Sequence, residues 1–220
     1  MYNMKLDEIK TLQTNLLQWG KENFRYYPWR QTRDPYNILI AEILLHRTKA
    51  EQVVPLYNEF IRNFPSINSV ATANFKNIRE ILASAGLFWR IELIHKMAKQ
   101  IHTEFNGRIP FKKLDLLSLP GVGEYIASAV RCFAWGCPEV IADTNTIRIT
   151  ARIFGVEVND GTRRSKKFHS LMKNLMANSH PREFNYSLLD LGAVICLPHN
   201  PSCKKCPLIT ICIFGKQYIR

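Results

Sequence analysis

Four cysteines near the end of the chain have the spacing of ligands for a metal centre. Six, two and five residues separate Cys196, Cys203, Cys206 and Cys212. Thiolates so close together in a chain can surround one zinc ion or one 4Fe-4S cluster, and the spacing alone leaves both open. Because the first residues show no export signal, we expect these thiols to bind a metal centre in a reducing compartment and not to form disulfides.

An aspartate ahead of an amphipathic segment is a candidate catalytic group. Asp143 follows the apolar residues 140–142, and Ile147, Ala151 and Phe154 then recur at helical spacing. A helix N-terminus favours an ionised carboxylate in a partly buried cleft, and such a carboxylate stabilises a cationic, oxocarbenium-like sugar. An ordinary helix N-cap is the alternative role for this aspartate. The sequence leaves both roles open.

A glutamate within an apolar segment is a second candidate. Glu42 lies inside residues 38–45, which are otherwise apolar and are expected to form a helix. Burying a lone carboxylate is costly, so the side chain must find a partner, stay protonated or face a cavity. A carboxyl facing a pocket could hydrogen-bond an extruded base, whereas a structural ion pair with Arg30 or Arg47 is the alternative.

A glycine-containing turn between two predicted helices is a candidate phosphate site. The segment 114–135 is expected to form a helix, a turn at Leu119–Gly123 and a second helix that begins near Glu124. The amides of Gly121, Val122 and Gly123 would then stand at the positive end of the second helix, where they can bind a DNA phosphate without reading sequence. A plain joint between packed helices is the alternative.

The composition favours a folded protein with a polyanionic partner. Thirty Lys and Arg against eighteen Asp and Glu give a formal net charge of +12 and a pI of about 9.6. A basic surface fits nucleic acid, although positive charge can also serve only solubility. With 46% hydrophobic residues the chain can bury a core, which argues against a disordered protein. No apolar run reaches the ~20 residues of a membrane helix, so we expect a cytoplasmic, nucleoid-associated protein without a membrane partner.

Helices are expected to position these residues. Apolar side chains recur at helical spacing in most of the chain, for example in residues 9–17 and 91–101, whereas strand alternation is weak and is best in residues 156–159. Turns at glycine and proline divide the chain into about ten helices of ordinary length. The sequence therefore predicts an all-α fold.

In combination, these motifs resemble the helix-hairpin-helix DNA glycosylases of the endonuclease III superfamily. The hairpin, Asp143 twenty residues after Gly123, and the cysteine array occur in the same order and at the same spacing as in that family. The resemblance extends over residues 24–212. It implies that the cysteines hold a 4Fe-4S cluster and not zinc, and that the partner is double-stranded DNA with a mismatched or damaged base, bound by a monomer.

The resemblance also implies a domain organisation. Two helical domains would flank a DNA-binding cleft. A six-helix barrel with the hairpin would span residues 27–137, and a discontinuous domain of residues 1–26 and 138–220 would carry the catalytic aspartate and the cluster loop.

Tyr125 distinguishes two chemistries within the superfamily. Bifunctional members resembling endonuclease III have a lysine at this position, two residues after the last glycine of the hairpin, and its amine attacks the sugar to form a Schiff base. A phenol cannot form that imine. We therefore expect a monofunctional glycosylase without strong strand-cleaving lyase activity, in which Asp143 stabilises the developing cation and helps to position the attacking water.

The subgroup is indicated by Tyr125 and by the residues that lead into Glu42. Tyr125, Glu42 and the stretches 28–30 and 33–36 look most like the archaeal-type G/T mismatch thymine glycosylases. This resemblance implies removal of thymine or uracil opposite guanine, with Tyr125 and Glu42 lining the base pocket.

Two alternatives remain. Mismatch adenine glycosylases, acting on adenine opposite guanine or 8-oxoguanine, share the Glu42 and Asn145 positions. They commonly carry a further C-terminal domain, and this chain ends eight residues after Cys212. A non-catalytic iron-sulfur DNA-binding module is the other alternative, but such a module has no need of an acid at the position of Asp143.

Base flipping requires side chains that fill the space left in the duplex. By resemblance, Leu87 matches an apolar wedge that inserts between base steps. His46 and Arg47, at the end of the helix that carries Glu42, match a second loop that contacts the opposite strand, and Asn145 is a further expected DNA contact.

Overall fold

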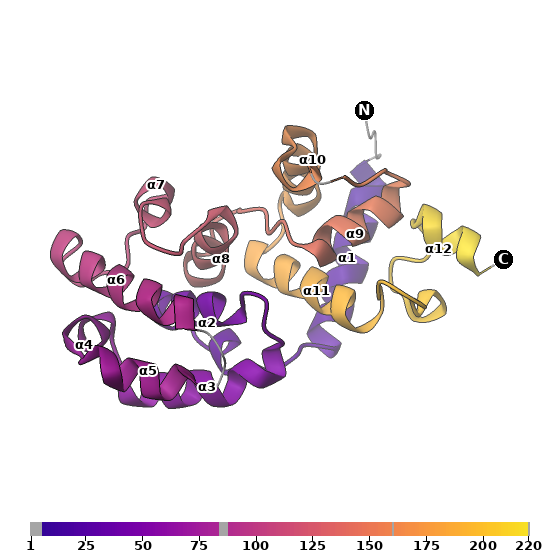
Figure 1. The fold of residues 1–220 in the computed structure, drawn as a ribbon. Helices are drawn as coiled ribbons and strands as arrows, with labels where there is room; N and C mark the ends of the chain where they lie inside the picture. Colours follow the sequence, from indigo (N-terminus) through magenta and orange to yellow (C-terminus); the bar gives the residue numbers. More distant parts are fainter. Residues whose placement is uncertain (1–5, 84–87, 160, 220) are drawn as a thin grey trace. The chain divides into compact units, whose positions relative to one another are not determined.

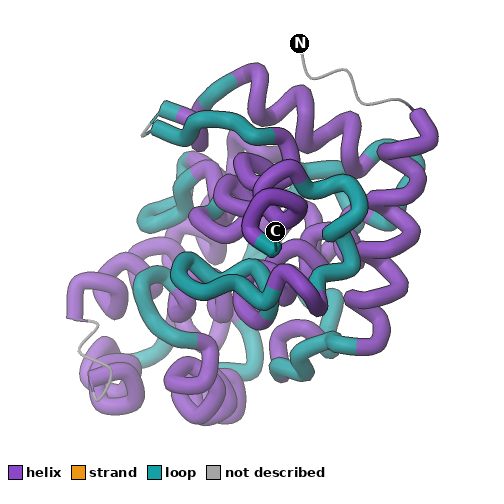
Figure 2. The backbone as a smooth tube through the Cα atoms, turned by 90° about the vertical axis from the view of Figure 1, so that its right-hand side faces the viewer, coloured by secondary structure: helices purple, strands orange, loops and turns teal. Residues whose placement is uncertain are grey.

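The computed structural model describes residues 6–83, 88–159 and 161–219, and its regular elements are all helical (Figures 1 and 2). Within these ranges there are twelve α-helices, three short 3-10 helices and no strand, so the predicted all-α fold is confirmed. The segment 156–159, the best strand candidate of the sequence, is a loop. None of the helices in the described part of the chain is long and apolar enough to span a membrane.

The chain divides into two compact units. Unit 1 combines Met1–Arg25 with Gly136–Arg220, and unit 2 is the continuous segment Tyr26–Trp135. The unit boundaries lie one or two residues from those expected from the sequence.

Unit 2 is built around a helix that is buried along most of its length. Its elements are η1 (Pro28–Arg30), α2 (Pro35–Leu45), α3 (Ala50–Asn63), α4 (Ile67–Thr72), α5 (Phe75–Ala83), α6 (Phe88–Glu104), α7 (Lys113–Leu117) and α8 (Glu124–Trp135). Helix α2 packs against α8, α3 and α6. Asp34 caps its N-terminus by accepting hydrogen bonds from the amides of Tyr36 and Asn37, and Pro35 occupies the first helical position, where its missing N–H costs nothing.

Unit 1 consists of a helical core and a C-terminal loop region. Its elements are α1 (Leu6–Glu22), α9 (Thr144–Phe154), η2 (Thr162–Arg164), α10 (Lys166–Met176), α11 (Pro181–Val194), η3 (Cys203–Lys205) and α12 (Ile213–Tyr218). Helix α11 packs against both α1 and α9, and α12 packs against α9. Gly20 permits the close approach of α1 to α11, because a Cβ atom there would lie 1.9 Å from the Ser187 hydroxyl oxygen.

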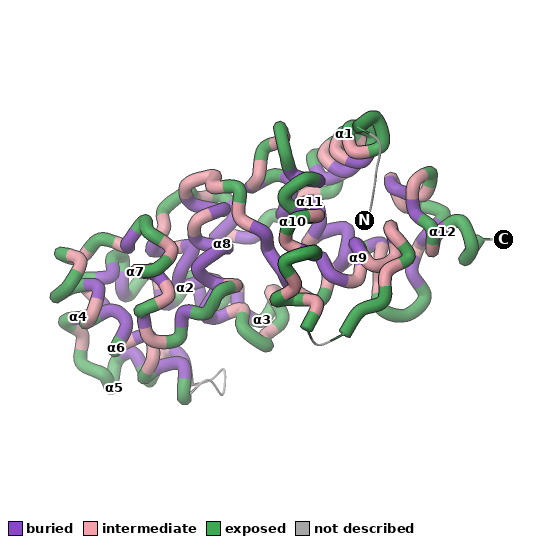
Figure 3. The backbone as a smooth tube through the Cα atoms, turned by 90° about the horizontal axis from the view of Figure 1, so that it is seen from above, coloured by how far each residue is buried: buried purple, intermediate pink, exposed green. Residues whose placement is uncertain are grey.

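An ion pair fixes the end of the first segment of unit 1 to α11. Arg25 Nε lies 2.6 Å from an oxygen of Asp190, whose side chain is fully buried. Most residues of α2, α8, α9 and α11 are buried or intermediate, as the colours of Figure 3 show. Each unit therefore has a core of its own that holds the site residues on rigid helices.

Candidate functional site

Asp143 is held by the backbone at the start of α9. It is the N-cap residue of that helix: one carboxylate oxygen accepts a hydrogen bond from the amide of Thr146 at 2.7 Å, and the Asp143 amide donates to the Thr146 hydroxyl at 3.0 Å. The side chain is half-buried, and Thr146 is fully buried. The structure thus shows the N-cap role that the sequence left open as an alternative, and the catalytic role of Asp143 stays a prediction. This reciprocal capping fixes the carboxylate at the helix N-terminus.

The second carboxylate oxygen of Asp143 begins a chain of hydrogen bonds. It accepts from the side-chain amide of Asn145 at 2.9 Å, and the Asn145 oxygen accepts from Arg148 Nη2 at 2.8 Å. Arg148 Nε donates to the backbone carbonyl of Cys196 at 2.9 Å. The carboxylate is therefore oriented by a network that ends at the first cysteine of the array.

Helix α11 contacts this network at Gly192. A Cβ atom at position 192 would lie 2.6 Å from the Asn145 Cβ atom, and the Gly192 carbonyl accepts from Arg148 Nη2 at 2.8 Å. Real Cβ atoms do not approach so closely. A residue without a side chain is therefore required at position 192 for Asn145 to reach Asp143.

The four predicted cysteine ligands are brought together around one small cavity in unit 1. Cys196, Cys203, Cys206 and Cys212 all line it, and Arg152 borders it too. N–H donors reach the sulfurs: Arg152 Nη1 lies 3.4 Å from the sulfur of Cys196, and the Gly215 amide lies 3.3 Å from that of Cys212. All four side chains are free thiols.

Burial acts on the thiols of this cavity. It raises the pKa of Cys206 to about 11, with the neighbouring cysteines adding to the effect, and it also raises the pKa of the Cys203 and Cys212 thiols. The cation of Arg152 opposes the rise in the pKa of Cys203.

In the described ranges, no three His, Cys, Asp or Glu side chains are arranged to hold a single metal ion.

In unit 2 the hairpin has the expected form. Helix α7 ends at Leu117, and α8 begins at Glu124. Gly121 has a φ of 80°, a left-handed conformation that favours glycine, and a Cβ atom there would lie 3.3 Å from the Leu93 side chain. Val122 is buried, and its amide donates to the Leu119 carbonyl at 3.1 Å, which anchors the turn. The first amides of α8 have no acceptor within the helix, and their N–H groups point out of the helix N-terminus, which carries a partial positive charge.

A polar clamp joins the two helices of the hairpin. Lys113 Nζ lies 3.1 Å from a carboxylate oxygen of Glu124 and donates to the hydroxyl of Ser128 at 3.0 Å. The clamp fixes α7 to the first turns of α8 and so helps to hold the turn between the two helices.

Glu42 and Tyr125 lie on two helices of unit 2 that pack together. Glu42 is on α2 and is only 5% exposed, and Tyr125 is the second residue of α8 and is half-buried. The burial of a carboxyl inside an apolar helix is as expected. A role in a base pocket remains a prediction for both residues.

The turn after α2 is basic and is held by hydrogen bonds from Arg90. Arg90, which is only 3% exposed, donates from Nη1 to the Leu44 carbonyl at 2.9 Å and to the Thr48 hydroxyl at 3.2 Å. Arg47 has a φ of 61°, which is uncommon for a residue with a side chain. The His46 ring packs edge-to-face on Trp89. Its partial burial, together with the Arg90 and Arg47 cations, lowers the pKa of the imidazole.

The predicted wedge, Leu87, lies outside the described residues.

The sequence did not reveal Arg148, Gly192 or Arg90 as positioning residues. Arg148 follows Asn145 by three residues on one helix, which is a local signal, but its contact with Cys196 spans 48 residues of sequence. Such a contact leaves no pattern in a single sequence.

The comparisons with known proteins define the family. Residues 40–174 match the model of the HhH-GPD superfamily of base excision DNA repair proteins. The chain is 39% identical to the thymine-DNA glycosylase of Aeropyrum pernix, with 94% of this chain and 95% of that protein covered. It is 35% identical to the thymine/uracil-DNA glycosylase of Pyrobaculum aerophilum, with 92% and 90% covered. The chain therefore belongs to the HhH-GPD superfamily of base excision DNA repair proteins.

The structural comparison agrees. A solved structure of a thermostable thymine-DNA glycosylase superposes with a TM-score of 0.89 at 32% identity, covering 96% of this chain and 98% of that one. Adenine DNA glycosylases are also similar, at 26 to 32% identity, but the chain spans only 39 to 65% of their length. The sequence comparison thus favours the thymine branch of the family.

Proposed function

We propose that the protein is a monofunctional DNA glycosylase of base excision repair that hydrolyses the N-glycosidic bond of thymine or uracil mispaired with guanine in double-stranded DNA. The observation that carries the proposal is Asp143, held at the N-terminus of α9 by a capping box and by Asn145, in a chain 39% identical to a thymine-DNA glycosylase. One chain contains both the hairpin and this aspartate, which supports action as a monomer. Genomic DNA as the substrate supports a cytoplasmic, nucleoid-associated location.

The proposed reaction divides into binding and hydrolysis. The amides of Gly121 and Gly123 bind a backbone phosphate, while the Val122 amide donates to the Leu119 carbonyl and holds the turn. The target nucleotide is flipped out of the duplex. The bond between the sugar C1′ and the base nitrogen breaks, and its electron pair leaves with the base. Asp143 stabilises the cationic sugar and accepts a proton from the water whose oxygen bonds to C1′. Glu42 and Tyr125 line the base pocket, and His46 and Arg47 contact the opposite strand.

The choice of base is tested by single-turnover assays on duplexes containing G:T, G:U, A:G or A:8-oxoguanine, each followed by alkali. We expect the strand with thymine or uracil to be cut and the adenine strands to stay intact. Cutting at adenine alone would assign the protein to the adenine glycosylases, with Glu42 as the candidate proton donor. The inactive variant Asp143→Asn serves as the blank for every duplex.

Tyr125 supports the monofunctional assignment because it stands at the second position of α8, directly after the hairpin. We predict that Tyr125→Lys gains some strand-nicking activity, because an amine at this place can attack the sugar and form an imine. The measurement is a covalent protein–DNA adduct trapped with borohydride, which the parent protein does not form. Tyr125→Phe is the matched control, since it changes the phenol without adding an amine. Equal trapping of the lysine and phenylalanine variants would contradict a position of residue 125 against the sugar.

We also propose that Cys196, Cys203, Cys206 and Cys212 hold a 4Fe-4S cluster. Four thiols around one cavity, with N–H donors directed at two of the sulfurs, supply the donor set that such a cluster requires. Binding would displace the thiol protons, whose loss burial now opposes. The cluster would act as a structural cross-link of the loop that carries the Cys196 carbonyl, the end of the network to Asp143.

The close approach at Gly192 supports the network as part of the site. We predict that Gly192→Ala lowers base release about 10- to 100-fold, because the new methyl group displaces Asn145 and turns the Asp143 carboxylate away from its fixed position. The rate of the chemical step is measured under single-turnover conditions. Ala193→Gly is a control at the next position of the same helix. If Gly192→Ala retains the parent rate, Asn145 does not position the carboxylate.

A further inference from the structure

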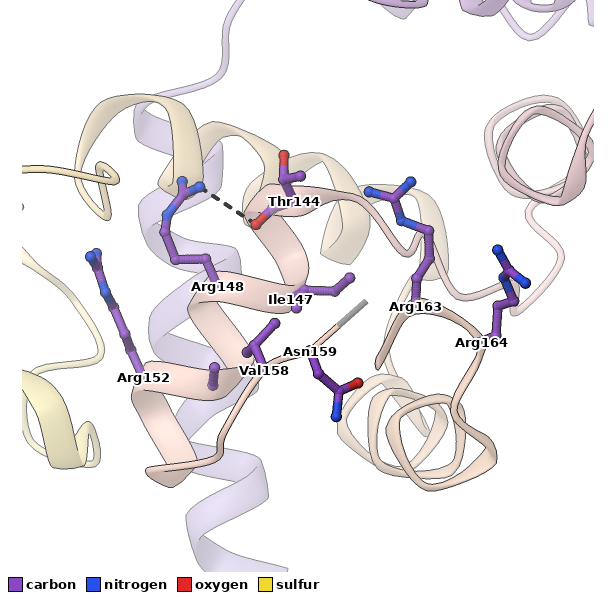
Figure 4. Close-up of a pocket in the computed structure, with 9 residues that line it drawn as sticks. Thr144, Ile147, Arg148, Arg152, Val158, Asn159, Arg163 and Arg164 are labelled. Atoms are coloured by element: carbon purple, nitrogen blue, oxygen red, sulfur yellow. Dashed lines mark hydrogen bonds between the residues drawn. The ribbon is translucent and has the colours of Figure 1, made fainter. Parts of the chain in front are cut away.

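A basic groove runs along α9 in unit 1 (Figure 4). Its volume is about 610 Å³, and nine residues line it: Thr144, Ile147, Arg148, Ala151, Arg152, Val158, Asn159, Arg163 and Arg164. The first five form one stripe of α9, and the other four come from the segment after α9 and from η2. Four arginines and no acidic residue line the groove, so its field favours an anion.

The four arginines differ in what they already bind. Arg148 and Arg152 donate to backbone carbonyls, as in the 2.6 Å hydrogen bond from Arg152 to Leu197. They contribute charge but few spare donors. Arg163 and Arg164 are exposed, and in the described part of the chain their guanidinium groups form no hydrogen bond or ion pair. These two side chains are available for a ligand.

The groove begins beside the catalytic aspartate. Thr144, at one end, is the next residue after Asp143, and Arg152 lies at the other end of the stripe. Eight residues of α-helix span about 12 Å. In Figure 4 the side chains of Thr144, Arg163 and Arg164 extend toward the same side of the groove. Thr144, Arg163 and Arg164 line the same groove, so a chain of negative groups that leaves Asp143 along this groove would pass the two arginines.

We propose that this groove binds the phosphodiester backbone of the DNA strand that carries the flipped nucleotide, with Arg163 and Arg164 in direct contact with phosphates next to it. The inference rests on the proposed function, because the sugar at Asp143 is continuous with that strand. At about 3.4 Å of rise per nucleotide, 12 Å corresponds to about three nucleotides. The contact reads no sequence, and it gives unit 1 a backbone site of its own in addition to the hairpin of unit 2.

The first test is the salt dependence of DNA binding. Binding of a G:T duplex to the Asp143→Asn protein is measured by fluorescence anisotropy at several salt concentrations. Adding Arg163→Ala and Arg164→Ala should weaken binding and reduce the slope of log K against log salt by about 0.9 for each phosphate that the protein no longer neutralises. The control pair Lys10→Ala and Lys21→Ala removes the same charge from exposed positions of α1 and should leave the slope unchanged.

The second test places the contact on one strand. Neutral methylphosphonate linkages replace single phosphates within three nucleotides of the thymine, on either strand, and binding is compared between the parent and the double arginine variant. We expect one or more neutral linkages on the thymine strand to weaken DNA binding by the parent protein. The same linkages should have little further effect on DNA binding by the double arginine variant. The lysine pair Arg163→Lys and Arg164→Lys should keep the salt slope, because the charge is retained.

Two outcomes would overturn the inference: equal salt slopes for the arginine and control pairs, or coupling only to phosphates of the opposite strand. The binding test is independent of base release. A parent protein that releases no base but still shows the arginine-dependent slope would refute the proposed function while leaving the groove as a DNA site.

Discussion

Asp143→Asn is expected to reduce base release by at least about 10²- to 10³-fold, because it removes the negative charge that stabilises the cationic sugar. The amide retains an oxygen that can accept the hydrogen bond from Thr146, and asparagine is as good an N-cap as aspartate. The variant should therefore fold and bind DNA almost as well as the parent. The measurement combines single-turnover base release with DNA binding of the same preparation.

A matched control separates loss of charge from loss of a helix cap. Asp34→Asn makes the same change at the N-cap of α2 in unit 2, where the carboxylate also accepts amide hydrogen bonds. We expect that protein to release base at the parent rate. An Asp143→Asn protein with the parent rate would exclude Asp143 as the catalytic carboxylate.

Cys206→Ala is expected to abolish cluster binding and to destabilise unit 1. The other three cysteines leave one corner of a four-ligand centre without its thiolate, and structural metal centres supply folding free energy directly. We expect a loss of more than about 3 kcal/mol, which lowers the melting temperature by about 6–12 °C. The purified parent should be brown and contain iron and inorganic sulfide, and the variant should be colourless and poor in both.

Cys137→Ala is the matched control, since Cys137 is a half-buried cysteine of the same unit that does not line the cavity. It should retain iron and melting temperature. A colourless parent protein with stoichiometric zinc would refute the cluster, and equal iron contents in the two variants would exclude Cys206 as a ligand.

Local signals account for what the sequence predicted well. The apolar periodicity of α1, α6 and α9, the proline and glycines of the hairpin, and an aspartate ahead of an amphipathic segment all act within a few residues. The structure accordingly confirms the helices, the turn at residues 119–123 and Asp143 as the N-cap of α9.

The roles that the sequence did not reveal depend on contacts between distant segments. Gly192 is required only because α11 crosses α9 at Asn145, and Arg148 finds its partner at Cys196 after a long separation in sequence. Likewise, nothing in the sequence distinguishes Arg163 and Arg164 from other charged surface residues. Only the folded loop after α9 places them at the groove. A single sequence carries no record of which helix faces which, so these roles could not be predicted.

The central claim is tested most directly by incubating the protein with a G:T duplex labelled on the thymine strand. Half of each sample is treated with alkali, and free bases are analysed by mass spectrometry. The account predicts released thymine and a strand that is cut only after alkali. Intact thymine nucleotides throughout, or a strand cut to the same extent without alkali, would contradict a monofunctional thymine glycosylase.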